Sequence, residues 1–409
     1  MTMTIPDRVI EPQTADSNAP AENKFSDAAA SEKRNEDGSL SRSRGRVGEG
    51  ASADDMSGAD PHPASDARRP PPQAGEVNQG QGGKQQRQGG QQKRDRRDVH
   101  GWVCLDKPVG MTSTHAVAVL KRLFNAKRAG HAGTLDPLAS GGLPIALGEA
   151  TKTVPFVMDG RKRYRFTVCW GEERDTDDTE GKATHTSPNR PTVDAIRALL
   201  PQFTGVIEQI PPQYSAIKIQ GERAYDMARD GEVVPLAPRP VEIHELTLVE
   251  QIDNDRSVFE AECGKGTYVR ALARDMGRIL GCFGHICALR RTLCGPFAEA
   301  DMIPLADLEA LCDRAASGEG NLADAHLPVE TALDDIPALA VTRADAARLH
   351  RGQAVLLRGR DAPISNGTVY ATVGGRLLAL AEIGNGELIP KRVFNLTGLT
   401  ASSGRKEGV

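Results

Sequence analysis

The chain has 409 residues, more than one ordinary globular domain holds. Residues 1–99 contain only eleven large apolar or cysteine side chains. They cannot bury enough apolar surface to offset the roughly 1–2 kcal/mol of backbone entropy that each ordered residue costs. We therefore predict a disordered extension at 1–99 and a fold confined to 100–409. The formal net charge of −4, taken as a sum, argues against a nucleic-acid binder.

Other features argue against a membrane protein and a secreted protein. No apolar run approaches 18 residues, and the N-terminus lacks the apolar core of a signal peptide. Seven cysteines at scattered spacings, without a CxxC pair, are typical of reduced thiols and not of a disulfide framework. We expect a cytoplasmic protein.

The end of the extension is basic. Residues 79–97 are rich in Gly and Gln and hold six Lys or Arg against one Asp. Such an arm either touches nucleic-acid phosphates or is only a solvated linker, and composition leaves both interpretations open.

The first predicted strand is the apolar run at 102–105. A helix follows, with Thr112 or Ser113 as its N-cap, and runs to about Phe124 because apolar residues recur there at helical spacing. The next predicted elements are a glycine-rich loop, a strand and a helix, at 130–142, 143–147 and 150–157.

Apolar and polar residues alternate over 163–170, which predicts a strand with one buried face. An acidic loop at 172–181 follows it. The later predicted strands lie at 214–219, 241–250, 257–263 and 286–292. The later predicted helices lie at 193–200, 222–229 and 267–280.

These elements lack regular βαβ alternation, so we predict an α+β fold with a mixed, largely antiparallel sheet and flanking helices. From about 335 the elements become shorter, with a helix at 343–350 and brief strands near 354–358, 367–373, 376–383 and 389–395. We place the main domain at 100–312, an irregular linker with one or two helical turns at 313–334, a small β-rich module at 335–397 and a disordered tail at 398–409.

The negative charge sum hides two basic stretches. Residues 107–165 carry a net +7 and residues 264–291 a net +5. If the fold brings them together they form an electropositive surface suited to nucleic acid. The alternative is two solvated helix faces.

The glycine-rich loop carries the strongest candidate for chemistry. Asp136 is a single carboxylate between Leu135 and Pro137, and His131 lies five residues earlier. In a basic surround such a carboxylate suits a nucleophile or a base, although Asp-Pro is also an ordinary turn signal.

A metal site is a weaker alternative elsewhere in the chain. The candidate ligands would be Cys282, His285, Cys287 and Cys294. Their spacing is not a standard zinc pattern, and buried thiols in a core explain them equally well.

Seven ordered segments between 101 and 300 carry a family resemblance. They read LDKPVGMTS (105–113), AGHAGTLDPLASGGLPIALGEATK (129–152), KRYRF (162–166), DTDDTEG (175–181), PPQYSAIKIQGERAYDMARDG (211–231), CGKGTYVRALARDMG (263–277) and HICALRRT (285–292). Together they resemble the TruB family of tRNA pseudouridine synthases. The module at 335–397 resembles the small RNA-binding PUA-type domain that ends members of this family.

The resemblance implies roles for individual residues. Asp136 matches the catalytic aspartate, and Tyr164 the tyrosine that stacks on the flipped base. Arg270 matches the arginine that pairs with the catalytic carboxylate, with Asp178 as a second acidic partner. The other implied residues line the uridine pocket (Tyr268, Leu289), contact the RNA (His131), support phosphate contacts (Lys152) or support the floor of the site (Lys107, Pro108).

The implied reaction converts uridine to pseudouridine at position 55, in the T-loop of tRNA, by base flipping and an aspartate-dependent rearrangement of the glycosidic bond. It needs no cofactor and no metal. The expected partner is the tRNA T-arm, with no membrane, no obligate protein partner and no guide RNA, and we expect a monomer. Two alternatives stay open: a tRNA-binding or RNA-folding protein with incidental catalysis, and a guide-RNA-dependent synthase. The segment at 192–235 resembles the insert of stand-alone bacterial enzymes, which favours guide-free action.

Overall fold

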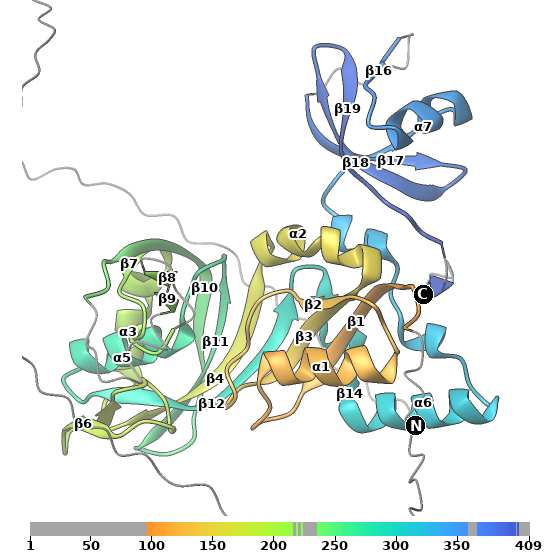
Figure 1. Cartoon of the computed structure of the whole chain (residues 1–409). Helices are drawn as coiled ribbons and strands as arrows, with labels where there is room; N and C mark the ends of the chain where they lie inside the picture. Colours follow the sequence, from red (N-terminus) through yellow and green to blue (C-terminus); the bar gives the residue numbers. More distant parts are fainter. Residues whose placement is uncertain are drawn as a thin grey trace, which may run out of the picture. The chain divides into compact units, whose positions relative to one another are not determined.

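A computed structural model of the chain (Figure 1) describes residues 96–215, 218–219, 222–223, 235–358, 366–397 and 399–400. The predicted extension lies outside the described residues as far as 95. Most of the predicted helix at 222–229 also lies outside them, and its first two residues form a short strand, β9 (Glu222–Arg223).

The predicted mixed sheet is present and has eleven strands. Its main path runs β14-β1-β3-β12-β4-β11-β10-β7, with β13 on β12, β2 on β3 and β20 on β1. The strands are β1 (Val99–Lys107), β2 (Ala129–His131), β3 (Ser140–Leu147), β4 (Lys162–Trp170), β7 (Gly205–Gln209), β10 (Arg239–Gln251), β11 (Arg256–Cys263), β12 (Gly284–Cys294), β13 (Phe297–Ala298), β14 (Met302–Pro304) and β20 (Leu399–Thr400).

Most neighbouring strands in this sheet run antiparallel. The exceptions are β1 with β14, β1 with β20, and β3 with β12. The parallel pairing of β3 with β12 matters for the site, because it sets Arg291 opposite Gly141 at the end of the glycine-rich loop.

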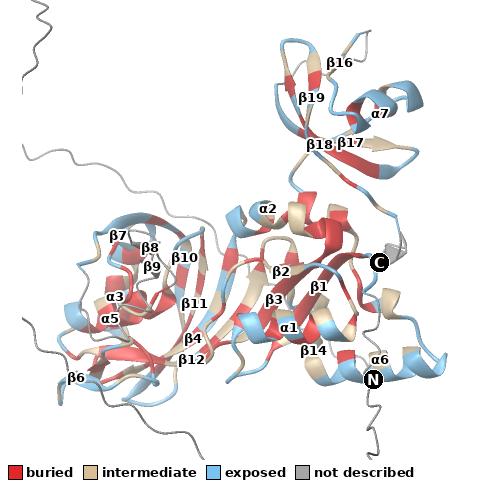
Figure 2. Cartoon of the chain, viewed as in Figure 1, coloured by how far each residue is buried: buried red, intermediate tan, exposed pale blue. Residues whose placement is uncertain are grey.

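The alternation predicted in β4 is confirmed. Phe166, Val168 and Trp170 are buried, whereas Arg163 and Arg165 are exposed. The ring of Phe166 stacks on Phe259 of β11, with the two centroids 5.5 Å apart. Buried residues concentrate along the central strands and the helices packed on them (Figure 2).

Helices cover this sheet. The α-helices of the main domain are α1 (Ser113–Leu123), α2 (Val154–Asp159), α3 (Val193–Leu199), α5 (Val269–Ile279) and α6 (Leu305–Ser317). Thr112 caps α1 as predicted, because its side chain accepts a hydrogen bond from the His115 amide. The helix α1 packs on β2 and β3, and α5 packs on β12 and β4. Among the described residues, no helix is long and apolar enough to cross a membrane.

The C-terminal module forms a second sheet of five strands, ordered β15-β17-β18-β19-β16. These are β15 (Ala338–Ala340), β16 (Val355–Leu356), β17 (Gly367–Val373), β18 (Arg376–Gly384) and β19 (Glu387–Val393), accompanied by α7 (Arg343–His350). The helix α7 and the strand β17 have the predicted bounds.

Several predicted bounds are wrong for local reasons. The single helix expected at 150–157 is split into a 3-10 helix, η1 (Gly148–Lys152), and α2, because Pro155 lacks an amide hydrogen and begins a helix more readily than it continues one. The acidic loop instead contains β5 (Glu172–Arg174), which pairs with β6 (Ala183–Thr186). Of the strand expected at 214–219, the described residues show only β8 (Lys218–Ile219).

The region after 300 is more ordered than predicted. The helix α6 was not expected, and it ends where Gly318 adopts the left-handed conformation that glycine tolerates best. The linker contains two 3-10 helices, η4 (Leu322–Ala325) and η5 (Val329–Leu333), which agrees with the one or two helical turns expected there. Two residues of the expected tail form β20 beside β1.

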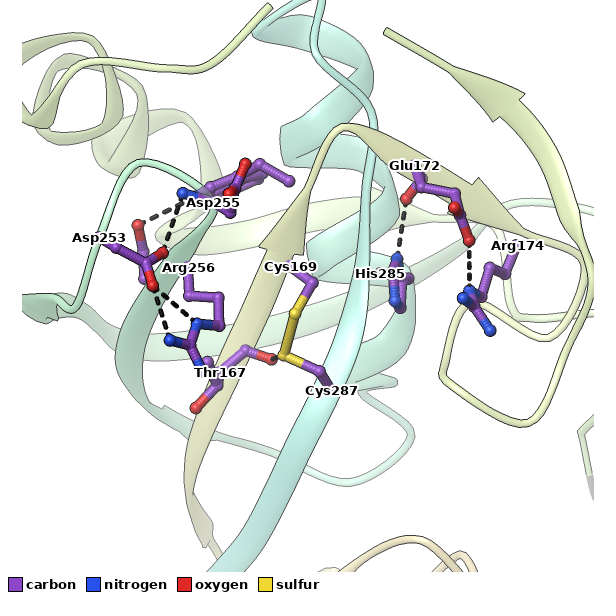
Figure 3. Close-up of a disulfide and its surroundings, with 11 residues drawn as sticks. Thr167, Cys169, Glu172, Arg174, Asp253, Asp255, Arg256, His285 and Cys287 are labelled. Atoms are coloured by element: carbon purple, nitrogen blue, oxygen red, sulfur yellow. Dashed lines mark hydrogen bonds and ion pairs between the residues drawn. A yellow bond between two sulfur atoms is a disulfide. The ribbon is translucent and has the colours of Figure 1, made fainter. Parts of the chain in front are cut away.

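The expectation that all seven thiols are reduced is wrong. Cys169 and Cys287 form a disulfide between β4 and β12, with their Cα atoms 5.9 Å apart (Figure 3). The two cysteines are 118 residues apart in the chain, and only the pairing of the two strands brings them together. A register shift between Ile286 and Ala288 sets Cys287 beside its partner. The other five cysteines are free.

Candidate active site

The loop between β2 and β3 holds Asp136 by its backbone. The hydroxyl of Ser113, at the start of α1, donates to the carbonyl of Leu135 and accepts from its amide, both at 2.9 Å. The amide of Ala139 donates to the Asp136 carbonyl. The Asp136 side chain remains one third exposed, so a ligand can reach it.

Arg270, in the first turn of α5, meets this carboxylate. Its Nε atom lies 2.9 Å from Oδ2 of Asp136, and its Nη1 atom lies 3.4 Å from Oδ2 of Asp178. The same guanidinium donates to the carbonyls of Thr176 at 2.8 Å and Tyr214 at 3.0 Å. The Arg270 side chain is only 6% exposed. The buried guanidinium of Arg270 therefore joins Asp136 to Asp178. Each of its three nitrogens has a partner, so its orientation is fixed.

Asp178 faces inward and is almost completely buried. The hydroxyl of Thr176 donates to its carboxylate at 2.6 Å, and the amide of Glu180 donates at 3.0 Å. These bonds fix the acidic partner of Arg270 in one orientation.

A second acid–base pair lies behind the first. Nη1 of Arg274 is 3.0 Å from Oδ2 of Asp177, and both side chains are buried. Burial raises the pKa of Asp177 to about 6, against the opposing effect of Arg274. Sequence reasoning missed this pair, although Arg274 lies one helical turn after Arg270, at the spacing that sets two side chains on one face.

Tyr164 and Leu289 come from adjacent strands. Tyr164 lies opposite Arg291 in the β4–β12 register, and Leu289 lies opposite Phe166. Burial raises the pKa of Tyr164 to about 12, so its hydroxyl stays protonated at neutral pH. Leu289 is buried.

Leu289 lines a cavity of about 410 Å³. Other walls of the cavity include Leu138 and Ser140, which follow Asp136 in the loop, and Arg165 and Arg290 at its charged side. Leu138 follows Asp136 by two positions in the chain, but neither Asp136 nor Tyr164 nor Arg270 lines this cavity.

Tyr268 immediately precedes α5 and is held by Gln209. The Tyr268 amide donates to Oε1 of Gln209 at 2.8 Å, and Nε2 of Gln209 donates to the Tyr268 carbonyl at 3.2 Å. Burial raises the pKa of the Tyr268 phenol. Gln209 is a positioning residue that no local signal in the sequence identifies.

Lys107 is buried next to the loop, whereas the adjoining Pro108 is exposed. The Lys107 ammonium is completely buried and donates to three carbonyls, those of Pro108 at 2.9 Å, Met111 at 2.8 Å and Pro137 at 3.4 Å. Burial lowers the pKa of Lys107 to about 8. One buried cation therefore ties the end of β1 to the residue that follows Asp136.

The structure does not bring all predicted site residues into this cluster. His131 is half-buried in β2, where burial lowers its pKa, and among the described residues its Nδ1 atom has no hydrogen-bond partner. Lys152 instead bonds Glu149 at 2.6 Å and the carbonyl of Val393 at 2.7 Å, so its described contacts are at the end of β19.

The candidate metal ligands do not converge. Nδ1 of His285 lies 2.9 Å from the carbonyl of Glu172 (Figure 3). Cys287 is in the disulfide, and Cys282 and Cys294 are buried thiols. The described residues contain no group of three or more His, Cys, Asp or Glu side chains arranged to hold a metal ion.

Many cations of the two basic stretches pair with carboxylates, several of them at the surface. Arg161 and Arg163 pair with Glu262 at 2.9 and 2.6 Å, and Arg165 lies 3.7 Å from Glu260. In the second stretch the ion-paired arginines are Arg270, Arg274, Arg278 and Arg290. The sums of +7 and +5 therefore overstate the positive charge that a nucleic acid would meet.

Comparisons with known proteins show the family. Residues 121–269 match the profile of the TruB family pseudouridylate synthase (N terminal domain), and residues 270–334 match the tRNA pseudouridylate synthase B C-terminal domain. A relative named tRNA pseudouridine synthase B, from Rhodopseudomonas palustris, is 86% identical over 78% of this chain and 87% of its own length. A relative of the same name from Rhizobium meliloti is 59% identical over 73% of this chain and 96% of its own length.

Solved structures share the fold. One titled "Structure of H/ACA RNP bound to a substrate RNA containing 2'-deoxyuridine" is 25% identical, with a TM-score of 0.57 over 72% of this chain and 85% of that one. A Cbf5-Nop10-Gar1 complex is 26% identical, with a TM-score of 0.57 over 73% and 85%.

Fold, site and profiles therefore define one class of enzyme, the pseudouridylate synthases, which are isomerases. Within this class, the chain belongs to the TruB family.

Proposed function

We propose that this chain converts uridine at position 55, in the T-loop of tRNA, to pseudouridine without a guide RNA, and that Asp136 is its catalytic carboxylate. The observation that carries the proposal is the contact between Asp136 and Arg270. A carboxylate that is one third exposed and held at 2.9 Å by a buried guanidinium is an accessible group with a fixed direction. Relatives named tRNA pseudouridine synthase B support tRNA as the substrate.

The reaction breaks the N1–C1′ bond of uridine, turns the base and joins C5 to C1′, while the proton of C5 leaves and N1 takes up a proton. Atoms are rearranged within one nucleotide, so no group donor or oxidant enters the balance. The enzyme has to supply a carboxylate that acts on the sugar or the base, a clamp on the detached base, and a site closed to water. Asp136 supplies the first of these.

Tyr164 supplies the clamp by stacking on the flipped base, an interaction that contributes about 1–3 kcal/mol in nucleic-acid complexes. Because burial raises the pKa of Tyr164 to about 12, the phenol acts as a neutral ring and hydrogen-bonding group. Tyr268 and Leu289 complete the uridine pocket, and Leu289 borders the 410 Å³ cavity beside the loop.

The target base has to leave its stack, which costs a few kcal/mol. In this proposal His131 contacts the RNA at the vacated place, and phosphate contacts involving Lys152 and the PUA-like module at 335–397 offset the unstacking. The proposal includes action as a monomer in the cytoplasm without an obligate protein partner.

A guide-RNA-dependent synthase is the second candidate, and the observation that favours it is the likeness of the fold to an H/ACA RNP bound to a substrate RNA. The decisive experiment incubates the purified chain with a bare T-arm stem-loop and no other RNA. We expect pseudouridine at the single target uridine, and none in a stem-loop with cytidine at that position. Conversion only after addition of a guide RNA would establish the second candidate.

An RNA-binding or RNA-folding protein with incidental catalysis is the remaining alternative. A gel shift distinguishes it when binding of the same stem-loop is measured beside turnover. A chain that binds the stem-loop tightly but yields no pseudouridine over long incubation would support this alternative.

A further inference from the structure

Arg291 is a completely buried arginine that sequence analysis counted only as part of a basic stretch. It lies in β12, is 1% exposed, and is among the largest fully buried side chains of the described residues. Within the described part of the chain, its guanidinium takes part in no ion pair with a carboxylate. Burying an unpaired cation is costly unless hydrogen bonds satisfy it, so such a group requires a structural reason.

The hydrogen bonds of Arg291 go to the two ends of the loop that carries Asp136. Its Nε atom donates to the carbonyl of Gly142 at 2.7 Å, after Asp136. Its Nη2 and Nη1 atoms donate to the carbonyls of Gly133 at 3.2 Å and Thr134 at 3.4 Å, before Asp136. The planar guanidinium of Arg291 therefore connects the two ends of the loop by hydrogen bonds.

The backbone of Arg291 also approaches this loop closely. Gly141 has a φ of 98°, and a Cβ atom there would lie 2.3 Å from the carbonyl oxygen of Arg291 and 2.9 Å from its amide nitrogen. Only glycine fits such a contact. Arg291 therefore contacts the loop with its main chain as well as with its side chain.

Arg291 reaches the other half of the site as well. It lies opposite Tyr164 in the β12–β4 register, and the positive charge of its guanidinium lowers the pKa of the Tyr164 phenol against the larger effect of burial. Arg291 thus bonds the loop of the candidate catalytic carboxylate and neighbours the residue proposed to stack on the base.

We propose that Arg291 is a positioning residue that sets the separation and orientation of Asp136 and Tyr164, an inference that rests on the function proposed above. Arg291 itself contacts neither substrate nor Asp136. Its effect is on the chemical step, because misplacing a reacting group by about 1 Å can lower a rate by about 100-fold while ground-state binding is kept.

The test uses Arg291→Lys, which keeps the charge and loses the fork, in the full chain with the T-arm stem-loop as substrate. We expect kcat to fall by about 10- to 100-fold while KM stays within about threefold. Arg256→Lys is the matched control, because Arg256 is exposed and pairs only with neighbouring Asp253, and it should keep wild-type kinetics. A folded Arg291→Lys with wild-type kcat would overturn the proposal, as would a rise in KM with unchanged kcat.

A second variant, Tyr164→Phe, keeps the proposal testable if Arg291→Lys does not fold. It removes only the hydroxyl on which the Arg291 charge acts and keeps the ring. Positioning predicts a fall in kcat of similar size at every pH from 6.5 to 9, because the hydroxyl stays protonated throughout. An unchanged kcat, or a loss that appears only at one end of this range, would contradict positioning. A wild-type chain without turnover would instead refute the proposed function, so the two failures are distinguishable.

Discussion

The Nε atom of Arg270 lies 2.9 Å from Oδ2 of Asp136, although 134 positions separate the two residues. The same guanidinium reaches Asp178 and two backbone carbonyls, those of Thr176 and Tyr214. It therefore joins the loop that carries Asp136, the turn after β5 and the segment after β7 at one point, and much of the candidate site depends on it.

Replacing Arg270 should damage both rate and stability. In Arg270→Ala the buried Asp178 loses its cation, and breaking a buried pair in this way typically costs about 3–5 kcal/mol of unfolding free energy. Arg270→Lys keeps the charge but loses the fork, so we expect a smaller loss of stability and a rate lower by at least about 100-fold. Urea denaturation and single-turnover kinetics measure the two effects. Wild-type kinetics in a folded Arg270→Lys would remove this residue from the site.

Lys107→Met should loosen the floor of the site. Three carbonyls, those of Pro108, Met111 and Pro137, lose their shared donor, and each buried group left without a partner costs about 1–3 kcal/mol. The expected result is a lower free energy of unfolding and a lower kcat, because Pro137 adjoins Asp136. An unfolding midpoint equal to that of the wild type would contradict this role.

His326 should make the protein less stable in acid. Its ring stacks on Phe124 at 4.7 Å between centroids, is 7% exposed, and neither ring nitrogen has a partner among the described residues. Burial lowers its pKa from 6.5 to about 4. The unfolded state therefore binds the proton first as pH falls, so stability that is present above pH 6.5 is lost between 6.5 and about 4.

The test compares the wild type with His326→Leu by urea denaturation at pH 7 and pH 5. From the two pKa values, the histidine should account for about 2 kcal/mol of the stability that the wild type loses over this interval. The variant should therefore lose about that much less. Equal losses in the two proteins would show that His326 does not carry the acid sensitivity.

The disulfide predicts a thiol count. Alkylation of the unfolded chain without reductant should modify five cysteines, Cys104, Cys263, Cys282, Cys294 and Cys312, and reduction should raise the number to seven. Seven labelled thiols before reduction would show that the pair is open. Reduction should also lower the free energy of unfolding by about 2–4 kcal/mol, as is typical of a disulfide that closes a long loop.

Local patterns predicted much of the secondary structure. The alternation in β4 and the helical spacing in α1 and α7 are properties of consecutive residues, so the sequence is sufficient to find them. The single helix predicted at 150–157 is wrong because the prediction ignored the effect of Pro155, which begins a new helix instead of continuing one.

Local sequence patterns predicted less of the candidate site than of the secondary structure. Asp136 attracted attention as a lone carboxylate in a glycine-rich loop, but its partners Arg270 and Asp178 came only from the family resemblance. Gln209 and the Cys169–Cys287 disulfide were missed for a shared reason. Each depends on the pairing of distant segments, and no short-range signal encodes that pairing.

The central claim is that Asp136 performs the chemistry, and Asp136→Asn tests it most directly. The substitution keeps the size of the side chain and removes its charge. Its matched control is Asp159→Asn, since Asp159 is exposed and pairs only with the exposed Lys265. Release of tritium from C5-labelled uridine in tRNA should be abolished in Asp136→Asn, while tRNA binding is retained and Asp159→Asn turns over normally. Full turnover by a folded Asp136→Asn would falsify the claim.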